Sequence, residues 1–166
     1  MAAPLLIALD SALSQKVTEE LSRQLADLSG KETAQASLRD WGAVFVVETL
    51  EEAANLVNRI APEHLELLIK DPWSLLSSIR NAGAIFLGAF SSKVAGDYIA
   101  GPNHVLPTGG TARFSSPLSV EDFQRRSSVI SLSKAKFEEL CSAMIELASL
   151  EGLEAHAQAA RVRKGS

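Results

Sequence analysis

Cysteine and histidine are scarce in this chain. Its 166 residues include one cysteine, Cys141, and three histidines. A single thiol excludes an intrachain disulfide framework and a cysteine-rich zinc site. Basic residues are also in the minority, 16 Lys and Arg against 20 Asp and Glu, and the net charge of −4 argues against a surface built for nucleic acid or an anionic membrane. We therefore expect no nucleic acid and no membrane among the partners of this chain.

Long apolar runs are absent too. A membrane-spanning helix needs roughly 20 apolar residues, whereas the apolar opening, Met1 to Leu9, is interrupted by Asp10 and has no basic flank. This opening is therefore too short for a signal peptide with its flanking regions. The resulting expectation is a soluble protein of the cytoplasm, a reducing compartment in which a lone thiol is ordinary.

What is present is an ordinary globular composition, 46% hydrophobic and 22% charged. Short apolar stretches alternate with stretches in which apolar residues recur at helical spacing. Strands are expected at 5–9, 43–47 and 82–88, and helices at 13–28, 32–38, 50–60 and 73–79. The strand at 43–47 has no polar face, which predicts that both of its sides are covered. Strands that alternate with helices predict an α/β fold with a mostly parallel sheet.

Two local signals sharpen this reading. Thr49 and Glu52 have the spacing of a capping box, which predicts a helix beginning directly after Thr49. Residues 91–117, by contrast, are rich in Gly, Pro, Ser and Asn and show almost no periodicity. A loop of this length is uncommon in a compact domain and is usually functional or disordered. Because it contains Asp97 and His104, we favour a functional loop.

The end of the chain has a helical pattern. Ser119 and Asp122 could cap a short helix, and apolar residues between Phe137 and Ala148 recur at helical spacing. Residues 151–163 favour a final helix. We therefore expect an α/β domain at 1–118 and a helical tail at 119–166.

Glu63 and His64, in the segment PEHLE, are the first residues that could carry chemistry. Histidine titrates near neutral pH, and burial can raise a glutamate toward that range, so the two suit general acid–base work. Neighbouring side chains on a strand point to opposite faces, so both can serve one site only in a turn, which Pro62 favours. Read alone, His64 is more simply explained as a partly buried histidine whose hydrogen bonds are satisfied.

Asp97 and His104 form a second candidate group. They offer a carboxylate oxygen and an imidazole nitrogen, both of which zinc accepts. The alternative is an Asx turn beside a loop histidine. Glu151 and His156 lie five residues apart, or about 140° around a helix axis. They do not share one helix face, so if both act, they do so from adjoining faces, or the helix begins after Glu151. Alone they favour a solvated helix end.

The order of these motifs is more specific than any one of them. Five segments follow one another along the chain: APEHLELL, NAGAIFLG, AGDYIAGPNHVLPT, TARFSSPLSVEDFQRRSSVI and EGLEAHAQA. Together they resemble histidinol dehydrogenase from its middle to its C-terminus, over about Pro4 to Arg163. The phrase GDYIAGPNHVLPT is long and chemically unusual, and all three histidines fall in matching motifs.

This resemblance implies an NAD-dependent enzyme of histidine biosynthesis, built on an incomplete Rossmann-like parallel sheet flanked by helices. Such an enzyme oxidises L-histidinol, through histidinal, to L-histidine. Glu63 and His64 would be its acid–base pair, with His64 relaying protons and Glu63 activating the water that attacks the aldehyde. The other roles that the resemblance implies are zinc ligation by Asp97 and His156 and substrate contact by His104 and Glu151.

The resemblance also implies a homodimer in which the swapped tail brings Glu151 and His156 to the partner's site. Family members are longer on the N-terminal side, which supplies most of the NAD-binding domain and two further zinc ligands. Here no Gly-rich phosphate loop follows a strand, so NAD-binding residues cannot be named, and the zinc site is expected to be incomplete. We therefore expect a truncated chain that is inactive alone and needs its missing N-terminal part.

Two hypotheses of different class remain. In the first, the chain is the catalytic part of a histidinol dehydrogenase. In the second, it is a non-catalytic remnant or split subunit that acts as a binding or assembly module. The intact Glu63, His64 and Asp97 favour the enzyme, and the chain length favours the module. A generic α/β domain that binds a small molecule agrees less well with the motifs, and an amino alcohol other than histidinol stays open as the substrate.

Overall fold

The computed structural model describes residues 2–164. They form two compact units that divide between Phe123 and Gln124. The domain boundary expected near Leu118 stays a prediction, and the outermost residues of the two expected domains, 1 and 165–166, lie outside the described range.

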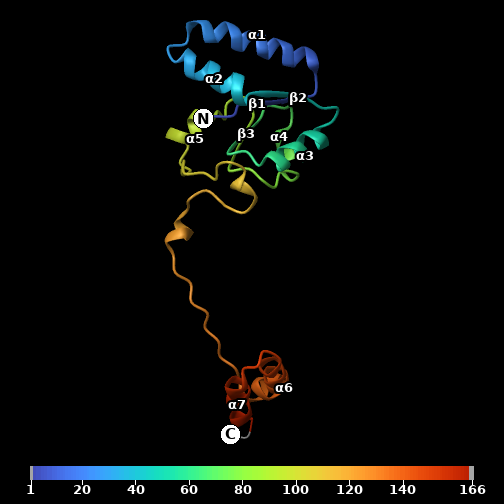
Figure 1. The fold of residues 1–166 in the computed structure, drawn as a ribbon, viewed down its shortest axis with the longest axis vertical. Coiled ribbons are helices and arrows are strands. Elements are labelled where there is room, and N and C mark those ends of the chain that lie inside the picture. Colours follow the sequence, from blue (N-terminus) through green and yellow to red (C-terminus); the bar gives the residue numbers. More distant parts are fainter. Residues whose placement is uncertain (1, 165–166) are drawn as a thin grey trace. The chain divides into compact units, whose positions relative to one another are not determined.

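The first unit begins with two parallel strands joined by two helices. In chain order, these elements are β1 (Leu5–Ala8), α1 (Ser11–Asp27), α2 (Lys31–Trp41) and β2 (Ala43–Val46). Leu5 lies opposite Ala43 in the ladder, and α1 and α2 lie together beside the strand pair (Figure 1). α1 begins at Ser11, two residues before the expected start, because the side chain of Asp10 accepts a hydrogen bond from Ala12 N at 2.9 Å.

A second parallel pair follows. Its elements are α3 (Leu50–Ile60), β3 (His64–Leu67), α4 (Pro72–Leu76) and β4 (Ala84–Leu87). The register places His64 opposite Ala84 and Glu66 opposite Phe86. One side of this pair faces the core of the unit, which consists of Ala54, Leu67 and Leu75 with partly buried aliphatic side chains around them. Burial of this aliphatic cluster fixes α3 and α4 against the strands.

The capping box at the start of α3 is present with one change. Thr49 Oγ1 accepts a hydrogen bond from Glu52 N at 3.1 Å, as expected. The Glu52 carboxylate accepts its return bond at 2.9 Å from Glu48 N rather than from Thr49 N. The Glu52 side chain thus holds the backbone at Glu48, one residue before the N-cap residue Thr49.

Two expectations about the first unit are wrong. β2 is not covered on both sides, because Val44 and Val46 are 50% and 53% exposed, respectively, while the alternate residues are partly buried. The segment 91–117 is not a plain loop either. It contains helix α5 (Lys93–Tyr98) and a 3₁₀ turn, η1 (Thr111–Arg113). A second 3₁₀ turn, η2 (Val120–Phe123), follows where Ser119 and Asp122 predict a short helix.

The second unit is a helix pair. α6 (Lys134–Leu150) and α7 (Glu154–Arg163) pack on each other through the fully buried Cys141 and Ala157. Between them, Gly152 has φ 72°, and Leu153 N donates to Ala148 O at 2.8 Å. This is a Schellman turn, in which glycine takes the left-handed conformation that ends a helix. The final helix therefore begins after Glu151.

The predicted α/β class is confirmed: short parallel strand pairs are flanked by helices, and the chain ends in helices. The ladders join the strands as β1–β2 and β3–β4. No helix within residues 2–164 combines the length and the apolar character that crossing a membrane requires.

Candidate active site

His64 is the centre of the site, and the end of α3 determines its position. That helix stops at Ile60 because Ala61 turns into the left-handed region, with φ 52°, and Pro62 follows. Two residues later the chain enters β3, with His64 as its first residue. The ring is largely buried, with 21% of the side chain exposed.

Two carboxylates flank the imidazole, one beside each ring nitrogen. Glu63 Oε1 lies 3.8 Å from His64 Nδ1, and Asp97 Oδ1 lies 3.6 Å from His64 Nε2. Both separations exceed hydrogen-bond length, and among the described residues the buried Nε2 has no hydrogen-bond partner. A shift of a few tenths of an ångström would bring Asp97 Oδ1 within hydrogen-bond distance of His64 Nε2. A bend at Glu63 brings its carboxylate to 3.8 Å from His64 Nδ1, and their service in one site stays a prediction.

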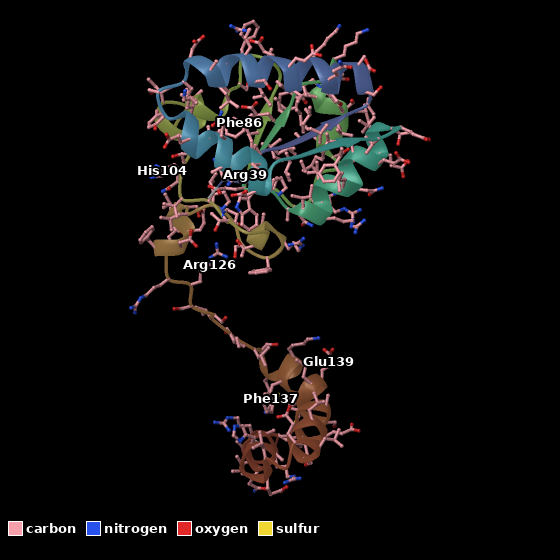
Figure 2. The ribbon with its side chains drawn as sticks, turned by 45° about the horizontal axis from the view of Figure 1, so that its top comes forward. Arg39, Phe86, His104, Arg126, Phe137 and Glu139 are labelled. Atoms are coloured by element: carbon pink, nitrogen blue, oxygen red, sulfur yellow. The ribbon has the colours of Figure 1, made fainter. Side chains whose placement is uncertain are left out.

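An aromatic ring supports the imidazole from β4. Phe86 stacks on His64, with ring centroids 6.1 Å apart and an angle of 25° between the planes. Figure 2 labels Phe86 inside the first unit, among the side chains between its helices. Offset stacking of this kind limits the rotation of the imidazole and keeps its two nitrogens directed at the carboxylates.

Lys93 and Glu66 hold Asp97 in place. The Lys93 ammonium donates a hydrogen bond to Asp97 Oδ2, one turn along α5. The backbone N–H of Lys93 donates to Glu66 Oε1 at 2.9 Å, so a carboxylate from β3 caps the start of α5. The Lys93 hydrogen bond holds the pKa of the Asp97 carboxyl below its ordinary value, and the same bond raises the pKa of Lys93. Asp97 is therefore a carboxylate at neutral pH.

The other predicted site residues lie elsewhere. His104 is exposed and follows α5, at the edge of the first unit (Figure 2). Glu151 caps the end of α6 and His156 lies in the first turn of α7, both in the second unit. The first unit thus brings together Glu63, His64 and Asp97. Within residues 2–164, no group of three or more His, Cys, Asp or Glu side chains is placed to hold a metal ion.

Three members of this site were not predicted. Lys93, Glu66 and Phe86 surround the catalytic candidates, and the sequence motifs assign a role to none of them. Lys93 and Asp97 have the i, i+4 spacing of a helical ion pair, and this signal could have been found had the helix been expected. The Phe86 and Glu66 contacts depend on strand register, which the sequence does not encode locally.

These features define a class of site: a histidine between two carboxylates, at the start of a parallel strand in an α/β protein, and these are the residue types of general acid–base sites. The family model described as histidinol dehydrogenase matches residues 1–164 of the chain. The chain belongs to the histidinol dehydrogenase family.

Individual relatives agree with this assignment. A histidinol dehydrogenase of Halalkalibacterium halodurans is 56% identical over 162 residues, which make up 98% of this chain and 38% of that protein. The Bacillus subtilis protein of the same name is 54% identical over 92% of this chain and 36% of its own length. The crystal structure of histidinol dehydrogenase from Elizabethkingia anophelis matches 96% of this chain, and 36% of its own, with a TM-score of 0.88 and 33% identity. The chain spans little more than a third of the length of these relatives.

Proposed function

We propose that this chain carries the acid–base part of a histidinol dehydrogenase, which oxidises L-histidinol to L-histidine with NAD as the hydride acceptor. The observation that supports this most directly is His64 between the carboxylates of Glu63 and Asp97. The names of the relatives, all histidinol dehydrogenases, supply the substrate class. Because the chain covers little more than a third of those proteins, the reaction is proposed for a complete assembly rather than for the chain alone.

His64 accepts the proton that each oxidation releases. Converting an alcohol to an aldehyde removes one hydride and one proton, and the imidazole accepts the hydroxyl proton at a ring nitrogen. The aldehyde must then add water before a second hydride can leave. Glu63, adjacent to His64 and 39% exposed, accepts a proton from this water. Asp97 stabilises the imidazolium that forms when His64 is protonated.

The resemblance implies zinc, but the described residues do not form a zinc site by themselves. A catalytic zinc needs about three protein ligands, whereas the first unit offers Asp97, whose carboxylate already binds Lys93. His156, the other proposed ligand, belongs to the second unit. We therefore derive no step through zinc or NAD, and we expect both to require residues from beyond this chain.

The tail completes the site from a second copy in this proposal. Glu151 and His156 lie next to the Schellman turn between α6 and α7, and this turn fixes their separation. From there Glu151 would contact the substrate and His156 would be a zinc ligand, while His104 would contact the substrate from its own chain. A homodimer follows, because each site then needs residues of both subunits.

The main test is complementation. The chain would be mixed with a separately produced segment that covers the unmatched part of the Halalkalibacterium halodurans enzyme, and NADH formation from histidinol would be followed. We expect no turnover from the chain alone and turnover from the mixture. His64→Asn should lower that rate by at least about 100-fold, and Glu63→Gln should slow the oxidation of histidinal more than that of histidinol. Glu32→Gln, an exposed change in the first turn of α2, serves as the control.

Other results would favour the alternative. Formation of a complex without turnover would indicate an assembly module, and turnover that survives His64→Asn would remove the acid–base role. The shared site has its own test, because mixing His64→Asn and His156→Ala chains in the presence of the complementing segment creates hybrid dimers with one intact site. Recovery on the order of a quarter of the wild-type rate is expected for random pairing, and no recovery would contradict the swapped tail.

A further inference from the structure

Arg113, in η1, holds two backbone segments together. Its Nη2 donates a hydrogen bond to Arg59 O in the last turn of α3, and its Nη1 donates to Gly110 O at 2.8 Å. The last carbonyls of a helix lack partners within the helix and carry partial negative charge, so a guanidinium suits this position. Its planar fork binds both carbonyls at once. The segment 107–113, which we call the strap, is thus tied to the end of α3.

The strap also lies against the backbone of the site. At its start, Pro107 is buried, and a Cβ atom added at Gly83 would lie 3.1 Å from Pro107 Cδ and 2.6 Å from Glu63 O. The strap, Gly83 and the Glu63 backbone are therefore packed without room for a side chain at position 83. Within the strap, Thr111 N and Oγ1 both donate to Thr108 O, at 3.1 and 2.7 Å. These bonds make the strap a closed turn.

The short connection between α3 and β3 carries Glu63 and is held on both sides. The backbone N–H groups of Gly83 and Ala84 donate hydrogen bonds to its last two carbonyls, at 2.9 and 2.8 Å. The strap reaches the α3 side of this connection through Arg113 and the Gly83 side through Pro107. A displacement of the strap would therefore be transmitted to the backbone of Glu63.

We propose that Arg113 is a positioning residue for Glu63. By tying the strap to α3, it fixes the backbone from which the Glu63 carboxylate reaches the reacting water. This inference rests on the proposed function, in which Glu63 accepts a proton from the water that adds to the aldehyde. Arg113 acts through the backbone and not on the substrate. Because Glu63 serves the second oxidation, loss of Arg113 should weaken that step more than the first.

The first experiment needs no turnover. Amide hydrogen exchange, followed by NMR on the full chain, reports how often the hydrogen bonds of Gly83 N and Ala84 N open. Arg113→Met should raise the exchange rates of these two amides by about tenfold, because it removes hydrogen bonds from a charged donor. Val47 N, which donates to Ala8 O at 2.9 Å beside the β1–β2 pair, should exchange as in the wild type. A general loss of stability would raise all three rates.

Arg163→Met is the matched control. Arg163 Nη1 donates to Ala159 O at 2.6 Å in α7, in the second unit, so its loss should leave the exchange of Gly83 and Ala84 unchanged. Arg113→Lys keeps the positive charge but not the fork, and its exchange rates should fall between those of the wild type and Arg113→Met. If Arg113→Met does not fold, as judged by circular dichroism, Arg113→Gln takes its place.

The second readout is the rate of the complemented mixture. Arg113→Met should lower kcat for NADH formation from histidinal by about tenfold, the effect of a displaced catalytic group. The first NADH formed from histidinol should be affected less, and KM should stay as in the wild type. Equal losses in the two oxidations, or unchanged exchange of Gly83 and Ala84, would overturn the inference. If the wild-type mixture shows no turnover, the proposed function fails, while the exchange rates still decide whether Arg113 holds the Glu63 backbone.

Discussion

Gly96 of α5 lies directly against the ring of Phe86 on β4. A Cβ atom added at position 96 would lie 2.5 Å from Phe86 Cε1, closer than carbon atoms can pack. The same ring stacks on His64 from its strand. Phe86 therefore packs against both α5, which carries Asp97, and the His64 imidazole that Asp97 faces. The distance between Asp97 and His64 depends on this one ring.

Gly96→Ala should disturb the packing of α5 on Phe86. The added methyl group forces either α5 or the Phe86 ring to move, and overpacking of this kind costs about 1–3 kcal/mol. The free energy of unfolding, measured by urea denaturation, should fall by that amount. Gly30→Ala is the control, because a Cβ there meets no atom within 4 Å. Equal losses for the two variants would contradict the close packing of α5 on β4.

Asn58→Ala should loosen the connection between α4 and β4. The Asn58 side chain donates to Ser78 O at 2.8 Å and accepts from the backbone N–H groups of Arg80 and Asn81 at 2.7 and 3.2 Å. Its removal leaves three backbone groups without this partner, at a cost of about 1–3 kcal/mol. Asn55→Ala, at an exposed position of α3, the helix that carries Asn58, is the control. Thermal unfolding of both variants gives the comparison, and a matching decrease in Tm would count against the role of Asn58.

Thr49→Ala should weaken the start of α3 by about 1 kcal/mol, the usual cost of losing an N-cap hydrogen bond. Ser92→Ala tests the opposite case. Ser92 is the N-cap of α5 but makes no capping hydrogen bond with its side chain, and Glu66 caps this helix instead. The Ser92 change should therefore stay within about 0.5 kcal/mol. Chemical denaturation distinguishes the two, and a larger effect at Ser92 would show that this assignment of caps is wrong.

Glu20 should titrate at unusually low pH. Hydrogen bonds, first from Arg23 and then from Gln24, lower the pKa of Glu20 from 4.5 to about 2. Because the folded-state pKa lies below the unfolded one, the stabilising contribution is complete above pH 4.5 and is lost as the pH falls toward 2. NMR titration of this carboxyl should show the low midpoint, and high salt should raise it by screening the exposed pair.

Two variants check the cause of this pKa shift. Arg23→Gln should move the Glu20 midpoint up toward 4.5, because it removes the strongest hydrogen-bond donor. Arg39→Gln, which removes a different exposed ion pair with Asp40, should leave the midpoint where it is. An unchanged midpoint in Arg23→Gln would contradict the assignment.

The elements that the sequence predicts are those with local signals. α1 has an N-cap at Asp10, α3 has a capping box, and β4 has a continuous apolar run, and each is found near its expected bounds. α5 was missed because its support is not local. Glu66 and Phe86 hold it from strands that lie nearby only after β3 and β4 have paired.

The site divides in the same way. Glu63 and His64 are neighbours in sequence, so a bend at Glu63 is enough to bring their side chains within 3.8 Å of each other. The contact between His64 and Asp97 spans 33 positions and depends on the fold of the whole first unit. The sequence does not predict the role of Lys93, because this role depends on the helix that places Lys93 next to Asp97. Glu151 had a local signal, Gly152, which ends α6 and separates this residue from the helix of His156.

Side chains alternate along β3, so its two faces have different surroundings. His64 and Glu66 share one side with Phe86, while Leu65 and Leu67 share the other with the aliphatic core. A mutation that retunes the chemistry on the first side need not disturb the packing on the second. A single-residue insertion within the strand would exchange the two sides and disrupt both at once. A substitution on one side of β3 can therefore leave the other side intact, whereas a change in the length of the strand cannot.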